Sequence, residues 1–102
     1  MKTIQLINIL EGKTYPEAGT ALFPYLVDAI NEGERICIDM SGVDSIPTLF
    51  MNTSFGEVLQ IYGITSFKKS ISFAHIQRSQ AERIKKHLID YERAYLKEHI
   101  SK

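Results

Sequence analysis

The sequence predicts a small α/β domain in which helices pack on a mixed or mostly parallel sheet. Strand-like and helix-like segments alternate along the chain in the order strand, helix, strand, helix, strand, helix, and the connections between them are short. Of the 102 residues, 44% are hydrophobic and 24% are charged, which is close to the average of globular proteins. A chain of this length buries roughly two-thirds of its unfolded surface, so we expect one domain with one core.

Alternation and capping signals predict the first strand and the first helix. Apolar side chains alternate on two faces over residues 3–10, which predicts a strand. Thr14 and Glu17 have the spacing of a capping box, and a proline lies in the first turn, where its missing N–H costs nothing. A broad apolar stripe follows, and Gly33 fits the left-handed position past the helix end. The helix is therefore expected over about residues 15–32.

The second strand is expected at the centre of the sheet. Residues 35–40 are apolar on both sides almost to the end, which is typical of a strand covered on both faces. Ser45 followed by Pro47 resembles a helix N-cap, and the next helix is expected to run to about residue 62 and to end at Gly63. The internal Gly56 suggests close backbone packing. The expected core face of this helix comprises Leu49, Met51, Phe55, Val58, Leu59 and Tyr62.

A third strand and a long last helix complete the predicted domain. Residues 68–74 alternate as a strand, and Ser79 and Glu82 have the spacing of a second capping box, which opens a helix over about residues 80–99. At ~1.5 Å per residue this helix is roughly 30 Å long, so we expect its end to overhang a sheet of about 22 Å. Its second apolar stripe is a candidate oligomer contact, formed by Ile89, Leu96 and Ile100.

Composition argues against several classes of function. The 12 basic and 12 acidic residues cancel, so no bulk field attracts the chain to nucleic acid or anionic lipid. No apolar run approaches the roughly 20 residues of a membrane-spanning helix, and the N-terminus does not resemble a signal peptide, which predicts a cytoplasmic protein without a membrane partner. The only cysteine, Cys37, cannot form an internal disulfide and is expected in the core.

The spacing of reactive residues predicts no metal site, no cofactor and no catalytic residue. His75, His87 and His99 have no partner at the spacing of metal ligands. The glycines match no phosphate-binding loop, and no GxSxG motif is present. Basic residues of the last helix alternate with acidic ones at spacings that form ion pairs within a helix, which is typical of a solvated face. Weak nucleic-acid binding through this helix is the alternative.

The segment from Asp39 to Asn52 has the clearest functional pattern. A central strand ends in an aspartate and leads through hydroxyl-bearing residues into a helix, and ligands and partners of open α/β sheets gather outside the carboxyl ends of strands. A phosphate added to a hydroxyl near this helix start would bring about two negative charges to the surface. The simpler interpretation is that Ser45 and Thr48 only cap the helix.

The stretch ICIDMSGVDSIPTLFMNTSFGEVL, residues 36–59, resembles the signature of STAS domains, the modules related to anti-sigma-factor antagonists. It is more similar to the STAS-like domain family of unknown function, whose pattern of a hydroxyl residue, Phe, Asn or Asp, and Gly is matched by Thr48, Phe50, Asn52 and Gly56. The Asp-Ser-x-Gly of classical antagonists is replaced here by a segment in which Thr48 alone keeps the hydroxyl.

The resemblance implies that residues 1–102 form a single STAS-like domain with helices on one side of its sheet. It also implies a non-enzymatic regulatory module that binds a protein partner, which in classical members is an ATPase-type kinase. Thr48 is then the candidate phosphorylation site, and the candidate partner-binding residues are Ser41, Asp44, Ser45, Thr48 and Asn52. The alternative is a constitutive structural or oligomerisation subunit that associates through the last helix.

Overall fold

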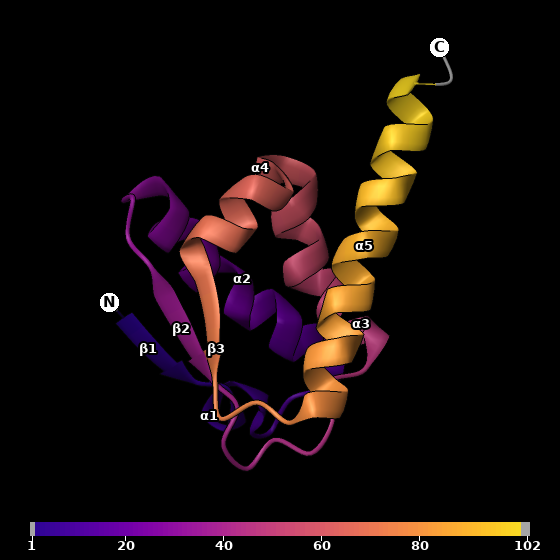
Figure 1. Cartoon of the computed structure of the whole chain (residues 1–102). Coiled ribbons are helices and arrows are strands. Elements are labelled where there is room, and N and C mark those ends of the chain that lie inside the picture. The colour runs from indigo at the N-terminus through magenta and orange to yellow at the C-terminus, as the bar shows by residue number, and fades with distance from the viewer. Residues whose placement is uncertain (1, 101–102) are drawn as a thin grey trace.

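The computed structural model describes residues 2–100, with side chains for residues 2–94. Three strands and five helices occur within residues 2–100, in the alternating order that the sequence predicts, and Figure 1 shows the helices gathered on one side of the sheet. Along the chain the elements are β1 (Lys2–Gln5), α1 (Leu6–Leu10), α2 (Tyr15–Asn31), β2 (Ile36–Asp39), α3 (Thr48–Thr53), α4 (Phe55–Ser70), β3 (Ile71–Ala74) and α5 (Arg78–Ile100).

The sheet is wholly parallel over the described strands, and β2 is its central strand as predicted. The expectation that β2 is covered on both faces is wrong. Ile36 and Ile38 are buried on the face toward the helices, but Cys37 and Asp39 point the other way and are only half-buried. Cys37 is therefore not a core residue, because no described helix covers its face of the sheet.

The first predicted strand is half strand and half helix. It pairs with β2 only as far as Gln5, which lies opposite Asp39, and from Leu6 the chain turns into α1. The strand ends there because the chain turns away from β1 after Asp39. The Met40 amide still donates to the Ala74 carbonyl of β3, but the Met40 carbonyl accepts from the Val43 amide in a turn, so later residues of the first segment would have no partner for their backbone groups. Leu6 is buried at the start of α1, whereas Ile7 is 41% exposed.

The predicted capping box at the start of α2 is present. The Glu17 amide donates to Thr14 Oγ1, and the Thr14 amide and hydroxyl donate to Glu17 Oε1 at 3.2 and 2.7 Å. These two hydrogen bonds from Thr14 lower the pKa of Glu17 below its ordinary value. The helix ends as predicted, with Gly33 at a φ of +68° just past it.

Close backbone packing occurs at Gly19 and not at Gly56, where the sequence suggested it. A methyl group at Gly19 would lie 2.6 Å from the Phe50 carbonyl oxygen and would overlap the Thr53 side chain, so α2 and α3 touch there. A methyl group at Gly56 would lie 3.5 Å from its nearest neighbour, which is an ordinary contact.

The single helix predicted between the second and third strands is two helices with a corner between them. Pro47, not Ser45, is the N-cap of α3, and Ser54 breaks the helix at φ −118° and ψ −81°, with its hydroxyl donating to the Phe50 carbonyl at 2.8 Å. The corner places the ring of Phe55 in the core, where it makes edge-to-face contacts with three other rings, those of Phe50, Phe67 and Phe73.

Gly63 divides α4 into two helical segments, and the first of them ends there as the sequence predicts. The Gly63 backbone lies at φ 86° and ψ 170°, and the chain then resumes a helical path to Ser70. Ser70 is followed directly by Ile71 of β3, so the third strand begins three residues later than predicted. The polar start of the predicted strand, residues 68–70, forms instead the last turn of α4, directly after the buried Phe67.

The last helix, α5, begins two residues before the prediction. Ser79 does not cap it, since the Ala81 amide donates to the Gln77 carbonyl and Glu82 instead pairs with Arg78. Ile84 is buried on the face toward the body, and Figure 1 shows the C-terminal turns extending beyond the other elements. Ile89 is 38% exposed, while the side chains of the other two predicted stripe residues, Leu96 and Ile100, lie outside the described residues.

Candidate functional site

A polar cluster closes the carboxyl end of β2. The Asp39 carboxylate accepts hydrogen bonds from the Ser41 amide at 2.9 Å and from the Ser41 hydroxyl at 2.7 Å. His75, just after β3, places its Nδ1 3.1 Å from the same carboxylate oxygen. The Ser41 hydrogen bonds, followed by the His75 contact, hold the pKa of Asp39 below its usual value.

This trio of serine, histidine and aspartate does not have the geometry of a nucleophile triad. In such a triad the hydroxyl donates to the imidazole, which in turn contacts the carboxylate. Here Ser41 and His75 both contact one oxygen of Asp39, so the imidazole is not placed to take the Ser41 proton. The cluster joins the ends of two neighbouring strands and fixes the turn that starts the loop to α3.

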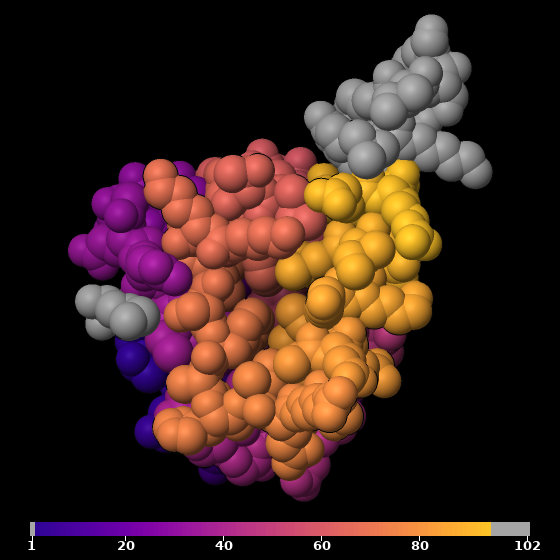
Figure 2. Space-filling model, in the orientation of Figure 1, coloured from indigo at the N-terminus to yellow at the C-terminus, as the bar shows by residue number. Residues whose placement is uncertain are grey.

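The residues predicted for partner binding are exposed without exception. They lie on the loop after β2 and on α3, and Figure 2 shows this loop, in magenta, at the lower edge of the molecule. We call them the junction surface: Ser41, Asp44, Ser45, Thr48 and Asn52. Ser41 is held at the strand end by Asp39, whereas Asn52 contacts His87 of α5 through its Oδ1 at 3.3 Å. The surface thus extends from the sheet edge to α5.

Thr48 lies in a hollow between α3 and α5, which we call the α3–α5 cleft. The cleft has a volume of about 280 Å³, and its lining consists of Thr48, Met51, Arg83, Lys86, His87 and Asp90. Thr48 is exposed, and among the described residues its hydroxyl has no hydrogen-bond partner. The simpler prediction, that the Thr48 side chain caps the helix, is wrong: Pro47 is the N-cap residue of α3, and no side chain makes a capping hydrogen bond there.

His87 is the half-buried histidine of this cleft. Its Nε2 lies 3.3 Å from Asn52 Oδ1, and its Nδ1 is buried with no partner among the described residues. Burial lowers the pKa of His87, and the charge of Asp90 opposes this only in part. The imidazole is therefore neutral near pH 7 and is not a surface histidine of the ordinary kind.

Leu49 belongs to the exposed surface beside Thr48, and the prediction that it lies in the core is wrong. Its side chain is 59% exposed on α3, directly beside Thr48 and between the polar residues of the junction surface. The buried positions that follow repeat every four residues in two rows, one from Phe50 and one from Met51. That repeat was visible in the sequence, and it places Leu49 on the outer face.

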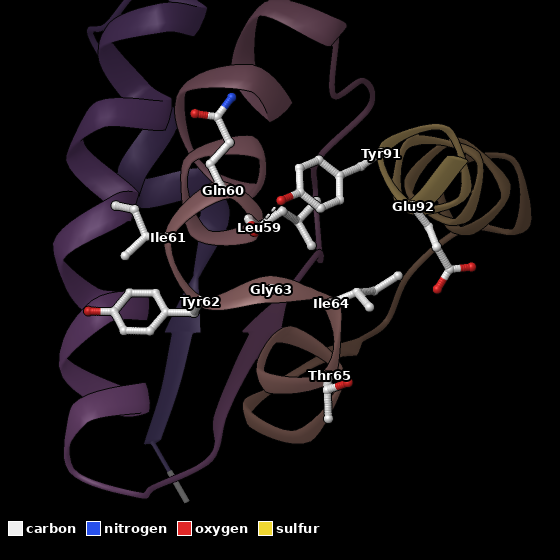
Figure 3. A pocket seen from close by; sticks show the side chains of 9 residues that line it. All are labelled: Leu59, Gln60, Ile61, Tyr62, Gly63, Ile64, Thr65, Tyr91 and Glu92. Carbon is white, nitrogen blue, oxygen red and sulfur yellow. Dashed lines mark hydrogen bonds between the residues drawn. The ribbon is translucent and has the colours of Figure 1, made fainter. Parts of the chain in front are cut away.

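A second hollow, which the sequence did not reveal, lies at the interruption of α4. It has a volume of about 460 Å³ and lies around Gly63 between α4 and α5 (Figure 3). Figure 3 shows Tyr91 reaching from α5 toward Leu59, and the Tyr91 hydroxyl donates to the Leu59 carbonyl at 2.7 Å. Tyr62 points to the other side, toward α2, where its hydroxyl donates to Asn31.

Two further kinds of site are absent from the described residues. No group of three or more His, Cys, Asp or Glu side chains is arranged to hold a metal ion in that part of the chain. Among the helices described, none combines the length and the apolar character needed to cross a membrane.

The fold and the site define a small α/β domain that exposes a polar junction after the central strand of a parallel sheet. The family model of the STAS-like domain of unknown function (DUF4325) matches residues 18–81, from α2 to the start of α5. The chain belongs to this family, as the resemblance of the central segment implies. No curated protein and no solved structure matches the chain.

Proposed function

We propose that this protein is a regulatory protein-interaction module without catalytic activity, and that it binds its partner through the junction surface. The partner class that we propose is an ATPase-type regulatory kinase, as in the classical antagonists that the central segment resembles. Thr48 is the proposed phosphorylation site, and its phosphate switches the binding.

The observation that supports this proposal most directly is the position of Leu49. It is an apolar side chain, 59% exposed, on the short helix that also carries Thr48 and Asn52. Protein interfaces typically combine an apolar anchor with a polar rim. Leu49 supplies such an anchor, and the junction surface supplies the rim.

The position of Thr48 supports the switch. Thr48 is exposed at the start of α3 and its hydroxyl has no hydrogen-bond partner among the described residues, so phosphorylation breaks no side-chain hydrogen bond. Phosphorylation adds about −1.5 to −2 charges at pH 7. That charge appears beside the Leu49 anchor, where it changes any contact with a partner.

The test is capture from native lysate on the immobilised protein, followed by mass spectrometry and by affinity measurement on the retained partner. We expect the wild type and Thr48→Ala to retain an ATPase-type kinase, and Thr48→Glu and Leu49→Asp to lose it. Ile61→Asp is the matched control, because Ile61 is 60% exposed but lies on α4 away from the junction surface.

Each result has a distinct meaning. Equal retention by Leu49→Asp and the wild type would reject the junction surface as the binding site. Equal affinity of Thr48→Ala and Thr48→Glu would reject the switch and leave a constitutive scaffold. Retention of nucleic acid alone, lost on addition of salt, would point instead to the basic residues of α5.

A second candidate function is a constitutive oligomeric subunit, and the exposure of Ile89 favours it. Ile89 is 38% exposed on α5, in the stripe predicted to include Leu96 and Ile100. In that case light scattering gives a multiple of the 11.6 kDa chain mass, and Ile89→Glu or Leu96→Glu returns it to a single chain. An unchanged mass in both variants would exclude the stripe.

A further inference from the structure

The α5 side of the α3–α5 cleft presents one face of the helix to Thr48. Arg83, Lys86, His87 and Asp90 follow one another at intervals of three, one and three residues, so they share a face of α5. Thr48 and Met51 form the opposite wall on α3. Two basic side chains and the candidate phosphorylation site therefore line the same hollow, although they are far apart in sequence.

The charges in the cleft are not fully balanced. Arg83 is exposed and forms no ion pair with the described residues, whereas Lys86 Nζ lies 2.7 Å from Asp90 Oδ2. Both members of that pair are largely exposed, and such pairs contribute little and exchange partners readily. With His87 neutral, the cleft carries one unpaired positive charge and a second that Asp90 shares.

We propose that Arg83 and Lys86 bind the phosphate of phosphorylated Thr48 within the same chain, so that phosphorylation ties α3 to α5. This inference rests on the proposed phosphorylation of Thr48. A kinase supplies the phosphate from ATP: a bond forms between Thr48 Oγ1 and the γ-phosphorus, the bond from that phosphorus to the ADP oxygen breaks, and the kinase takes the hydroxyl proton. The guanidinium of Arg83 matches the phosphate by donating two parallel hydrogen bonds.

This arrangement makes the switch a conformational one. Between α5 and residues 43–52 the structure already has two hydrogen-bonded contacts, from Gln80 to the Val43 carbonyl at 2.8 Å and between His87 and Asn52 at 3.3 Å. A bound phosphate adds a third contact beside them and occupies part of the cleft. The phosphate then acts on a partner by closing this hollow, rather than by direct repulsion alone.

The first experiment is a ³¹P NMR titration of the full chain with phosphothreonine incorporated at position 48. The groups that face the phosphate across the cleft are Arg83, Lys86, His87 and Asp90. We expect its second pKa to lie below about 6, the value of an exposed phosphothreonine, and to return toward it in Arg83→Gln and in part in Lys86→Gln. Lys85→Gln is the matched control, since Lys85 lies on α5 but does not line the cleft.

A double-mutant cycle provides a second measurement that needs no phosphorylated protein. Thr48→Glu and the isosteric Thr48→Gln are compared by urea unfolding in the Arg83 and the Arg83→Gln backgrounds. We expect the Thr48→Glu variant to be more stable than the Thr48→Gln variant only when Arg83 is present, and the difference to shrink with added salt.

Two results would overturn the inference. One is a phosphate pKa that is the same in the wild type, Arg83→Gln and Lys85→Gln. The other is a coupling of zero between positions 48 and 83 at low salt. Neither experiment uses a partner protein. If no partner binds in lysate, the proposed function is rejected, but the measured contact between position 48 and Arg83 still stands. If instead that contact is absent, the proposed function still stands, with a phosphate that repels the partner directly.

Discussion

Gly56 and Gly63 belong to the same helix, α4, but have opposite conformational requirements. Gly63 lies at φ 86° and ψ 170°, a region of backbone conformation that is essentially restricted to glycine. Gly56 has no positive φ, and a methyl group there makes ordinary contacts. The space around Gly63 is open, so its requirement is one of backbone conformation and not of packing.

We therefore predict opposite effects of alanine at these two positions. Gly63→Ala should lower the free energy of unfolding by about 1–3 kcal/mol, because alanine is strained at this φ and ψ. Gly56→Ala should raise it by up to about 1 kcal/mol, because alanine has the higher helix propensity. Urea unfolding of the two variants beside the wild type tests both. A destabilised Gly56→Ala would show that the corner between α3 and α4 is tighter than the contacts indicate.

His87 predicts how stability depends on pH. Burial lowers its pKa in the folded chain, so below about pH 6.5 the unfolded chain binds a proton that the folded chain does not. Stability contributed by neutral His87 is thus complete above that pH and decreases as the pH falls toward the folded-state pKa. The carboxyls with lowered pKa, Glu17, Asp39 and Asp90, act in the same direction only below about pH 4.5.

The measurement is the difference in unfolding free energy between the wild type and His87→Gln from pH 8 to pH 5. We expect a constant difference above about pH 7 and a decreasing one below pH 6.5, as the wild type loses stability that the variant does not. Parallel curves over the whole range would mean that His87 has the same pKa in the folded chain as in the unfolded chain.

At the scale of elements, the helices α2 and α3 lie so close together that only a glycine fits at their contact, which is Gly19. At Gly19 an added methyl group would meet the Phe50 carbonyl oxygen at 2.6 Å and the Thr53 side chain. We predict that Gly19→Ala separates the helices and lowers the free energy of unfolding by about 1–3 kcal/mol, the range of overpacked sites. Combining it with Thr53→Ala, which removes one of the two clashes, should recover part of the loss. No recovery would place the strain at the backbone carbonyl alone.

The elements that could be predicted from sequence are those fixed by local interactions. The capping box of Thr14 and Glu17 involves neighbouring residues, and α2 has nearly the predicted bounds. The end of β1 could not be predicted, because it depends on where the chain after β2 turns away from β1, and β2 is distant in sequence. The corner at Ser54 was missed for a similar reason, since it serves the packing of Phe55 against rings from three elements.

The candidate site could be predicted in part for the same reason. Exposed polar residues after a buried strand identify the junction surface, whose residues are exposed as a partner surface requires. The error at Leu49 arose because the predicted core face included a residue that precedes the two buried rows starting at Phe50 and Met51, and the four-residue repeat of those rows leaves Leu49 on the outer face. No local sequence pattern indicates that Thr48 and Arg83 line the same hollow, because the two residues come together only when α5 packs beside α3.

At the scale of the whole molecule, the two faces of the sheet differ: the described helices cover one face and leave the other open. Parallel sheets usually have both faces covered, but the described helices cover only one face of this sheet. On the other face the aligned residues are small or polar, and the row Thr3, Cys37 and Ser72 is an example. The buried core therefore lies between the sheet and the helices, and the junction surface lies on the loop that follows the carboxyl end of β2 and on α3.

The direct passage from α4 into β3, without a linker, limits how the length of this chain can change. A residue inserted after Ser70 must either turn α4 by about 100°, which takes Phe67 out of the core, or shift β3 by one position, which moves Ile71 and Phe73 to the open face. We expect that insertion to abolish cooperative unfolding, and the same insertion after the exposed Gly12 to change the melting temperature little. Homologues should therefore differ in length in the loop before α2 and keep the α4–β3 junction constant, and equal tolerance at both places would contradict this.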